Sequence, residues 1–348
     1  MSSLQRDLFK KGNYAFDRLS EDEEPVDPTA PASRGMASHV KQKYSPLDWT
    51  ECFDTREIIT IPGTLDTFCV YKIEATVDTP GPVFLLHHGA GSSALSFGFT
   101  AKHIKEFTHG KCSIVAYDCR GHGNTKTEED TDFSQARLSD DLVLVAETLY
   151  QGNVPDIILV GHSMGGPIVV DVTQRKRLPH ILGVSVLDVV EGSAIEALVS
   201  MNSYLATRPT FFTSVEQAIQ WSVKSHTVRN VESARLSIPP LLKPQEDHPS
   251  QYVWRTDLRN TELYWTDWFT GLSTKFLACA AAKQLILAGT DRLDKTLIIG
   301  QMQGKFQLHI FPEAGHFLQE DAPSKTAHCL VEFWERNQRL VLPPKVKI

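Results

Sequence analysis

The sequence has no long hydrophobic run and little excess charge, and these absences narrow the classes of protein to consider. No stretch of about 18 apolar residues occurs, so no membrane span or membrane partner is predicted. The net charge of −7 gives no electrostatic reason to expect nucleic acid as a partner. Met1–Asp7 lacks the pattern of a signal peptide, so we expect residence in the cytosol, the nucleus or both, without secretion.

Cysteine is also sparse, and its spacing excludes the common cysteine-based sites. The six cysteines are scattered without a C-x-x-C pair, which predicts reduced thiols, most of them in the core. No H-E-x-x-H or similar cluster of metal ligands occurs, so we expect no metal and no other cofactor. The remaining composition, 41% hydrophobic and 22% charged, is that of an ordinary globular enzyme.

The polar and apolar residues are unevenly distributed, which predicts one folded domain with two tails. Residues 1–43 are polar and contain the acidic run Glu21–Glu24, followed by several prolines. Such a composition buries too little apolar surface to offset chain entropy, so we expect a disordered arm. The folded domain is expected over residues 44–339, with a C-terminal tail at 340–348.

Within this domain, short apolar runs alternate with amphipathic helical patterns. Helical spacing is clearest over residues 138–149, and a final helix is expected to start near Pro323. Two early strands followed by repeated strand–helix units predict a mostly parallel sheet flanked by helices, with an antiparallel edge. The predicted strands are 57–61, 68–74, 83–87, 114–117, 157–160, 183–187, 284–288 and 307–311.

The alternation stops between residues 192 and 280. This segment has no clear buried strand and is rich in helix formers and large aromatic residues. We interpret it as a helical cap inserted over the carboxyl edge of the sheet. Its middle, residues 238–249, contains several prolines and is expected to be a loop.

A G-x-S-x-G motif follows the apolar strand at 157–160 and precedes a helical pattern. Gly161 and Gly165 permit a sharp turn between strand and helix, which lifts the hydroxyl of Ser163 above the sheet. The amino end of the following helix also favours a developing oxyanion. The motif in this context predicts the α/β-hydrolase fold, with Ser163 as the nucleophile.

Acyl transfer also needs two backbone N–H donors for the oxyanion and a general base. The residue after the nucleophile, Met164, and Ala90 in the glycine-containing loop after the strand at 83–87 are the expected donors. His316 follows the last strand and can reach over the sheet to Ser163, so it is the expected base. His162 should point away from Ser163, and His122 is interpreted as part of a structural loop.

The acid that orients the histidine is left open by these patterns. Asp188 ends the strand at 183–187, and Asp291 follows the next strand. The usual chain order of this fold, serine, acid and histidine, admits both residues. The commoner position of the acid favours Asp291, and the other aspartate would form a turn or cap a helix.

Longer runs resemble a particular family, the protein phosphatase methylesterases. These enzymes remove the methyl ester from the C-terminal leucine of the type 2A phosphatase catalytic subunit. The similarity covers roughly Tyr44–Trp334 and includes cap segments that unrelated hydrolases do not share. The similar runs are 160–166, 188–192, 218–225, 229–235, 291–295 and 299–306.

The resemblance implies a triad of Ser163, Asp188 and His316, and therefore Asp188 rather than Asp291 as the acid. It implies the type 2A phosphatase catalytic subunit as protein partner, whose docking organises the triad. The chain departs from the family at Ala90, where relatives often carry glycine, although a backbone donor survives this change. Two other functions remain to be tested: a small-molecule carboxylesterase or lipase, and a non-enzymatic phosphatase-binding protein.

Overall fold

A computed structural model describes residues 43–290 and 292–338 of the chain. All but one residue of the expected N-terminal arm and all of the expected tail at 340–348 lie outside the described residues, as does Asp291. The chain divides into two compact units, Met1–Ser45 and Pro46–Ile348. All that follows concerns the second unit.

An eight-stranded sheet forms the centre of this unit, with strand order β1-β2-β4-β3-β5-β6-β9-β10. The first two strands pair antiparallel with each other, β2 pairs antiparallel with β4, and all other neighbours are parallel. All eight predicted strands are found, with ends within two residues of the prediction. They are β1 (Thr55–Thr60), β2 (Thr67–Ile73), β3 (Val83–His87), β4 (Ser113–Tyr117), β5 (Ile157–His162), β6 (Ile181–Leu187), β9 (Ala282–Ala288) and β10 (Gln307–Phe311).

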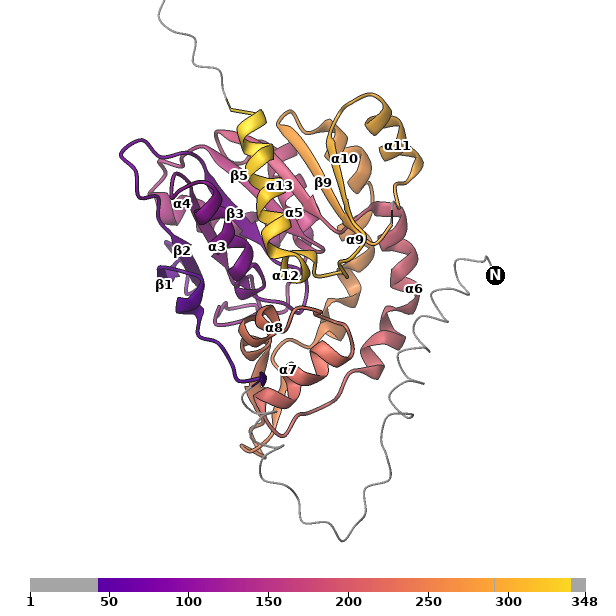
Figure 1. Cartoon of the computed structure of the whole chain (residues 1–348). Coiled ribbons are helices and arrows are strands. Elements are labelled where there is room, and N and C mark those ends of the chain that lie inside the picture. The colour runs from indigo at the N-terminus through magenta and orange to yellow at the C-terminus, as the bar shows by residue number, and fades with distance from the viewer. Residues whose placement is uncertain (1–42, 291, 339–348) are drawn as a thin grey trace, which may run out of the picture. The chain divides into compact units, whose positions relative to one another are not determined.

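The central strands are apolar throughout because helices cover both faces of the sheet (Figure 1). Along β3, Leu85 belongs to one hydrophobic cluster and its neighbour Leu86 to the other, as the alternation of side chains in a strand requires. One face is covered by α3 (Gly98–Phe107) and α13 (Pro323–Arg336), and the other by α4 (Gln135–Tyr150) and α5 (Gly165–Gln174).

The expected helix signals are found where the sequence placed them. Helix α4 begins after Ser134, whose side chain caps the first turn, and it buries Leu138, Leu142 and Val145. Helix α13 begins at Pro323, in the first turn where a missing N–H costs nothing. Among the helices of the described ranges, none is long and apolar enough to cross a membrane.

The segment between β6 and β9 is mostly helical, but the loop expected at 238–249 is partly wrong. Within it, β7 (Leu242–Pro244) pairs antiparallel with β8 (Tyr252–Trp254). Phe212 adds to this small sheet in two ways: its backbone forms a bridge with Tyr252, and its ring packs edge-on against that of Trp254. The helical elements are α6 (Glu191–Thr207), α7 (Val215–Lys224), α8 (Val231–Ser237), η3 (Pro239–Leu241), η4 (Leu258–Tyr264), α9 (Trp265–Phe269) and α10 (Leu272–Ala278).

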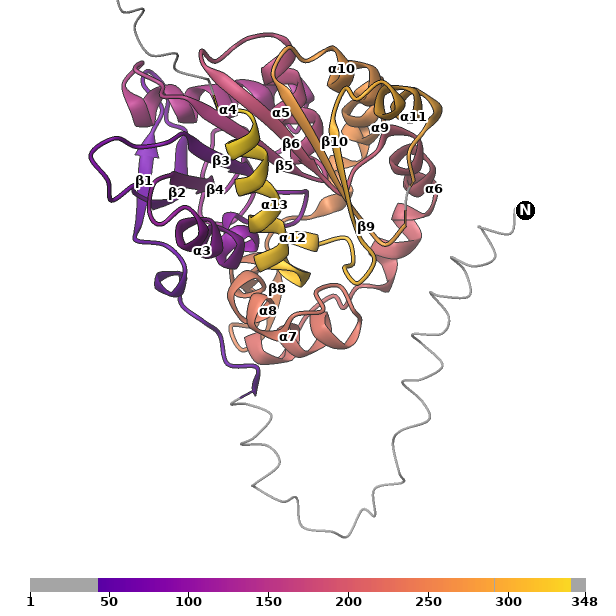
Figure 2. The same cartoon turned by 45° about the horizontal axis from the view of Figure 1, so that its top comes forward.

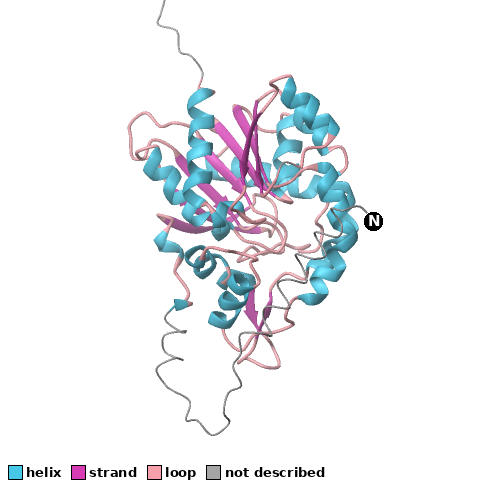
Figure 3. Cartoon of the chain, turned by 45° about the vertical axis from the view of Figure 1, so that its right-hand side comes forward, coloured by secondary structure: helices cyan, strands magenta, loops and turns pink. Residues whose placement is uncertain are grey.

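This inserted segment lies beyond the carboxyl ends of the parallel strands. Figure 2 shows α7 and α8 beyond the sheet, and Figure 3 shows the connecting loops, in pink, gathered beside the ends of the strands. Two hydrogen bonds attach the segment to the loop after β4: Thr256 donates to the carbonyl of Gly121 at 2.7 Å, and the Trp268 indole donates to that of Phe133 at 2.8 Å. The insertion therefore covers the edge at which the predicted site residues lie.

Candidate active site

Ser163 occupies the sharp turn between β5 and α5 that the motif predicted. Its φ of 51° lies in the left-handed region, which side-chain-bearing residues seldom adopt. Glycine is required on both sides of it. A Cβ at Gly161 would lie 2.2 Å from the carbonyl oxygen of Gly165, and one at Gly165 would lie 2.3 Å from that of His87. The turn therefore needs these two glycines for steric reasons.

His316 lies in the loop after β10, and its ring contacts Asp188 at the end of β6. The distance between His316 Nδ1 and Asp188 Oδ2 is 2.8 Å. Asp188, like Ser163, has a positive φ, of 50°. The structure thus brings together His316 and one of the two aspartates that the sequence motifs left open. The other, Asp291, lies outside the described residues.

Asp188 is buried, yet its surroundings favour the ionised carboxylate. Its second oxygen, Oδ1, accepts a hydrogen bond from the backbone N–H of Ala288 at 2.8 Å and one from the guanidinium of Arg292. Burial acts to raise the pKa of Asp188, but the hydrogen bond and charge of His316, with the charge of Arg292, bring the pKa below its ordinary value. An ionised Asp188 can hold the Nδ1–H tautomer of His316.

Two residues of this arrangement were not predicted from the sequence. Arg292 follows the undescribed residue 291, and nothing in its sequence context indicates a partner. His162 was expected only to point away from Ser163. Its ring in fact lies 4.8 Å from that of His316, and its Nε2 is 2.8 Å from the carbonyl oxygen of His316. Burial lowers the pKa of His162 to about 3, so the neutral ring donates to this carbonyl.

The hydrogen bond between histidine and serine that a working triad needs is not formed among the described residues. His316 is hydrogen-bonded to Asp188 but not to the hydroxyl of Ser163. The Asp188 side chain is 3% exposed and that of His316 50% exposed, so the acid is fixed while the base faces solvent. Catalytic hydrogen bonds in unbound enzymes often tighten only when substrate binds.

The expected oxyanion donors lie beside Ser163. A Cβ at Gly89 would be 3.0 Å from Cβ of Ser163, so the loop after β3 packs directly against the nucleophile. Within the described part of the chain, neither the Met164 nor the Ala90 backbone N–H donates to a protein acceptor. The N–H of Gly91, by contrast, donates to His122 Nε2 at 2.8 Å. Met164 and Ala90 therefore remain available for an oxyanion.

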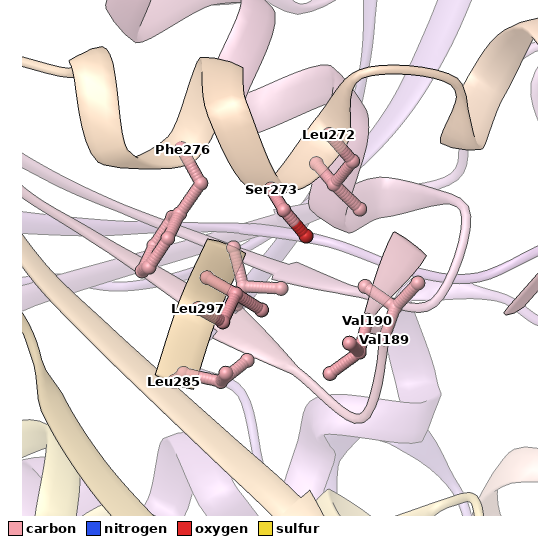
Figure 4. Close-up of a pocket in the computed structure, with 8 residues that line it drawn as sticks. Val189, Val190, Leu272, Ser273, Phe276, Leu285 and Leu297 are labelled. Atoms are coloured by element: carbon pink, nitrogen blue, oxygen red, sulfur yellow. The ribbon is translucent and has the colours of Figure 1, made fainter. Parts of the chain in front are cut away.

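The cavity beside the acid-bearing strand is a packing defect and not a substrate pocket. Figure 4 shows apolar side chains from Val189, Val190 and the cap helix α10 converging on it. Its volume of about 10 Å³ leaves room for no more than one water. The side chains around this cavity pack helix α10 of the cap against the segment that follows Asp188.

A larger cavity, of about 320 Å³, lies between the loop Gly121–Lys126 and the cap residues Lys243 and Arg255–Asp257. It is lined by both polar and charged groups, and His122 forms part of its wall. Over residues 43–290 and 292–338, no group of three or more His, Cys, Asp or Glu side chains is placed to hold a metal ion.

Comparisons with known proteins identify the family of the chain. The model of the "Alpha/beta hydrolase family" matches residues 83–328. A "Protein phosphatase methylesterase 1" of Aspergillus oryzae is 49% identical, over 86% of this chain and 74% of its own. The chain belongs to the protein phosphatase methylesterases. A methylesterase of Schizosaccharomyces pombe is 47% identical, over 86% of this chain and 88% of its own. As a member of this family, the chain is a hydrolase, and more specifically a methylesterase.

Solved structures support the same fold at much lower identity. An E-2-(acetamidomethylene)succinate hydrolase superimposes with a TM-score of 0.64 at 17% identity, over 81% of this chain and 99% of its own. An esterase of Mycobacterium tuberculosis superimposes with a TM-score of 0.59 at 18% identity, over 90% of this chain and all of its own. The methylesterase chain therefore has the α/β-hydrolase fold.

Proposed function

We propose that this methylesterase hydrolyses the methyl ester on the C-terminal leucine of the type 2A protein phosphatase catalytic subunit, with Ser163, Asp188 and His316 as its triad. The observation that carries the assignment of the triad is the 2.8 Å hydrogen bond between His316 and Asp188, on loops that flank the turn bearing Ser163. The family relatives support the choice of a protein phosphatase as substrate.

The reaction follows from the roles that these groups can take. His316 Nε2 accepts the proton of the Ser163 hydroxyl as its oxygen attacks the ester carbonyl. The tetrahedral oxyanion accepts hydrogen bonds from the N–H groups of Met164 and Ala90. The C–O bond to the methoxy group then breaks, His316 returns the proton, and methanol leaves an acyl-enzyme. Water attacks this ester with His316 as base, which releases the free carboxylate and restores Ser163.

Docking of a protein substrate would explain why Ser163 and His316 are not hydrogen-bonded in the structure. Of the three proposed triad residues, only Asp188 and His316 are hydrogen-bonded to each other, and the His316 side chain is half exposed. We propose that the docked phosphatase covers this side chain and brings its ring to the serine. The cost of the final alignment is then offset by binding energy from the protein surface.

The cap provides surface for such a partner. Val199 on α6 is 90% exposed and Leu263 on η4 is 86% exposed. The two elements contact each other through a hydrogen bond from Asn202 to Glu262 at 2.7 Å. Large apolar side chains left in solvent on contacting elements are typical of a protein-binding surface. All six cysteines are free and buried, which supports our placing the enzyme in a reducing compartment, the cytosol or nucleus.

The decisive experiment compares demethylation of carboxymethylated type 2A phosphatase by wild type and three variants. We expect Ser163→Ala to show no acyl-enzyme chemistry and Asp188→Asn to lose about 10⁴-fold in kcat, because the wrong histidine tautomer is then favoured. Asp291→Asn should retain most of its activity. Circular dichroism of each variant checks that it is folded.

Each other outcome removes one part of the proposal. If Asp291→Asn is inactive and Asp188→Asn is active, the acid is wrongly assigned. If wild type leaves the phosphatase methylated but hydrolyses p-nitrophenyl esters, the chain is a small-molecule esterase. If a fluorophosphonate probe fails to label Ser163 in folded protein, the chain is a non-enzymatic binder.

A further inference from the structure

Two buried histidines link the oxyanion loop to the neighbouring loop after β4 in a reciprocal manner. His88, in the loop after β3, lies with Nε2 3.0 Å from the backbone nitrogen of Cys119. His122, in the loop after β4, lies with Nε2 2.8 Å from the backbone nitrogen of Gly91. Each loop thus contributes one imidazole that accepts an N–H from the other loop. The two rings pack edge to face, with centroids 5.1 Å apart.

The remaining ring nitrogens determine the tautomer of both histidines. Nδ1 of His88 is 2.8 Å from the carbonyl oxygen of Gly89, and Nδ1 of His122 is 2.7 Å from that of Arg120. A carbonyl can only accept, so each Nδ1 carries the proton. Each Nε2 is then unprotonated, as its acceptor role requires. A single neutral tautomer therefore satisfies all four hydrogen bonds.

Burial keeps both rings neutral. His88 is fully buried and His122 is 1% exposed. Burial lowers the pKa of His122 to about 4, and it holds the pKa of His88 well below the ordinary value. The thiol of Cys119, whose pKa is raised by burial, contacts Nδ1 of His122 at 3.4 Å and adds no charge.

These hydrogen bonds determine which backbone N–H of the oxyanion loop is left free to bind an oxyanion. Ala90 and Gly91 are adjacent, and both amides lie in the loop that packs against Ser163. The N–H of Gly91 donates to His122, whereas the N–H of Ala90 has no protein acceptor among the described residues. The carbonyl of Gly89 and the N–H of Ala90 belong to one planar peptide unit, so the hydrogen bond from His88 Nδ1 to that carbonyl sets the direction of the Ala90 N–H. His122 fixes the next peptide unit through the N–H of Gly91.

We propose that His88 and His122 are positioning residues for the oxyanion hole, which by their reciprocal hydrogen bonds hold the N–H of Ala90 toward the nucleophile. This proposal rests on the assignment of Ser163 and Ala90 in the proposed function. The two histidines touch neither substrate nor the reacting atoms. They act through the backbone of the loop, which is why a serine-hydrolase motif in the sequence does not reveal them.

The first test measures the burst of p-nitrophenol release from p-nitrophenyl acetate, which reports acylation. His122→Phe keeps the size of a buried ring and removes the acceptor for Gly91. We expect its acylation rate at saturating ester to fall by about 10²-fold, with the half-saturating concentration changed by less than about twofold. His122→Gln supplies a carbonyl oxygen near the position of Nε2, and we expect it to restore most of the rate.

Two controls separate positioning from general stability and from failure of the proposed function. Thr125→Val removes the buried hydroxyl that accepts from Cys69 N and donates to the carbonyl of Asp118, in the same loop but without contact to Gly91. It should keep its acylation rate per folded enzyme. Ser163→Ala should abolish the burst; if it does not, the nucleophile is wrong whatever His122 does. Three results would overturn the proposal: a wild-type acylation rate in His122→Phe, no recovery of the rate in His122→Gln, or an equal loss of rate in Thr125→Val.

A measurement on wild-type enzyme avoids the risk that His122→Phe fails to fold. Nitrogen-15 labelling of histidine allows the tautomer of each ring to be read from its chemical shifts at pH 7. We expect His88 and His122 to be protonated at Nδ1 only. Protonation of either residue at Nε2 would remove the acceptor and contradict the proposal.

Discussion

At the scale of single residues, the site is built on strained backbone. Ser163 and Asp188 both have φ near 50°, in a region that costs a residue with a side chain about 1–3 kcal/mol. The strain is held in place by close neighbours, since the N–H of Ser163 donates to the carbonyl of Leu187 and its carbonyl accepts from the N–H of Gly166. The nucleophile therefore keeps its orientation at the expense of stability.

This strain predicts that Ser163→Gly is more stable than Ser163→Ala. Alanine keeps the strained φ, whereas glycine adopts it freely and gives back only part of the gain as unfolded-state entropy. We expect a difference of about 1 kcal/mol in the free energy of unfolding, measured by urea denaturation. Ser163→Ala should match wild type, and both variants should be inactive. Equal midpoints for glycine and alanine at this position would show that the turn is unstrained.

The sequence identified some of the site residues but not their supports. The G-x-S-x-G motif was sufficient to predict the turn that holds Ser163, because strand, turn and helix are local. The choice of Asp188 needed the family resemblance, since two aspartates satisfied the chain order. Arg292 and His122 act through contacts between loops that are far apart in sequence, so no local pattern could reveal them.

At the scale of secondary-structure elements, the cap is coupled to the loop of the general base. The carboxylate of Asp321 accepts from the N–H of Arg229, just before α8, and from the N–H of Gly315, just before His316, each at 2.7 Å. The Arg229 guanidinium donates to the carbonyl of Glu313 at 2.5 Å. Asp321 and Arg229 therefore link the start of α8 to the loop that carries His316.

This coupling predicts that Arg229→Ala impairs catalysis although Arg229 is remote from the chemistry. Loss of the guanidinium frees the carbonyl of Glu313 and loosens the loop of His316. We expect kcat for methylated phosphatase to fall about tenfold, since small displacements of a catalytic group cost about that much or more. Arg177→Ala, which removes an exposed ion pair with Asp140 outside the cap, is the matched control and should leave kcat unchanged. Equal kcat in Arg229→Ala and wild type would refute the coupling.

The strands were predictable as elements, and the cap was predictable only in outline. Buried parallel strands are recognisable because both faces must be apolar. The pair β7 and β8 was missed because each strand has three residues and contains prolines or aromatics that also suit a loop. Its formation depends on the distant Phe212, which bridges to Tyr252.

At the scale of the whole molecule, buried histidines make stability depend on pH. Burial lowers the pKa of His87 and of His122 to about 4 and that of His162 to about 3, and it holds that of His88 well below its ordinary value. Between these values and the unfolded pKa of about 6.5, the unfolded chain binds protons that the folded chain does not. The contribution of these four histidines to the free energy of unfolding is therefore complete above about pH 6.5 and is lost as the pH falls toward 4.

Four carboxyl groups oppose this trend. Burial raises the pKa of Asp118 to about 6, that of Glu320 well above its ordinary value, and those of Asp141 and Asp321 above theirs. A raised folded pKa gives stability that is present below the unfolded pKa, near 4, and is lost as the pH rises. These carboxyl groups therefore stabilise the folded protein in acid, whereas the four histidines destabilise it.

We expect the histidines to dominate, so that the free energy of unfolding falls by on the order of a few kcal/mol between pH 7 and pH 5. Urea denaturation at intervals of half a pH unit measures the slope. His87→Phe should make the slope shallower, because one depressed pKa is removed. His103→Gln, at an exposed position on α3, should leave it unchanged. A stability that rises from pH 7 to pH 5 would show that the carboxyl groups dominate.

The sequence by itself determined the order of the strands of the main sheet, the turn that holds the proposed nucleophile Ser163, and the family. These are properties of local patterns: continuous apolar runs, glycines around a serine and long runs of residues shared with relatives. The tertiary structure alone decided which side chains support the catalytic groups. Arg292 against Asp188, Asp321 against Arg229 and His122 against Gly91 are contacts across large separations in sequence, and their hydrogen bonds exist only once the sheet has brought the loops to one edge.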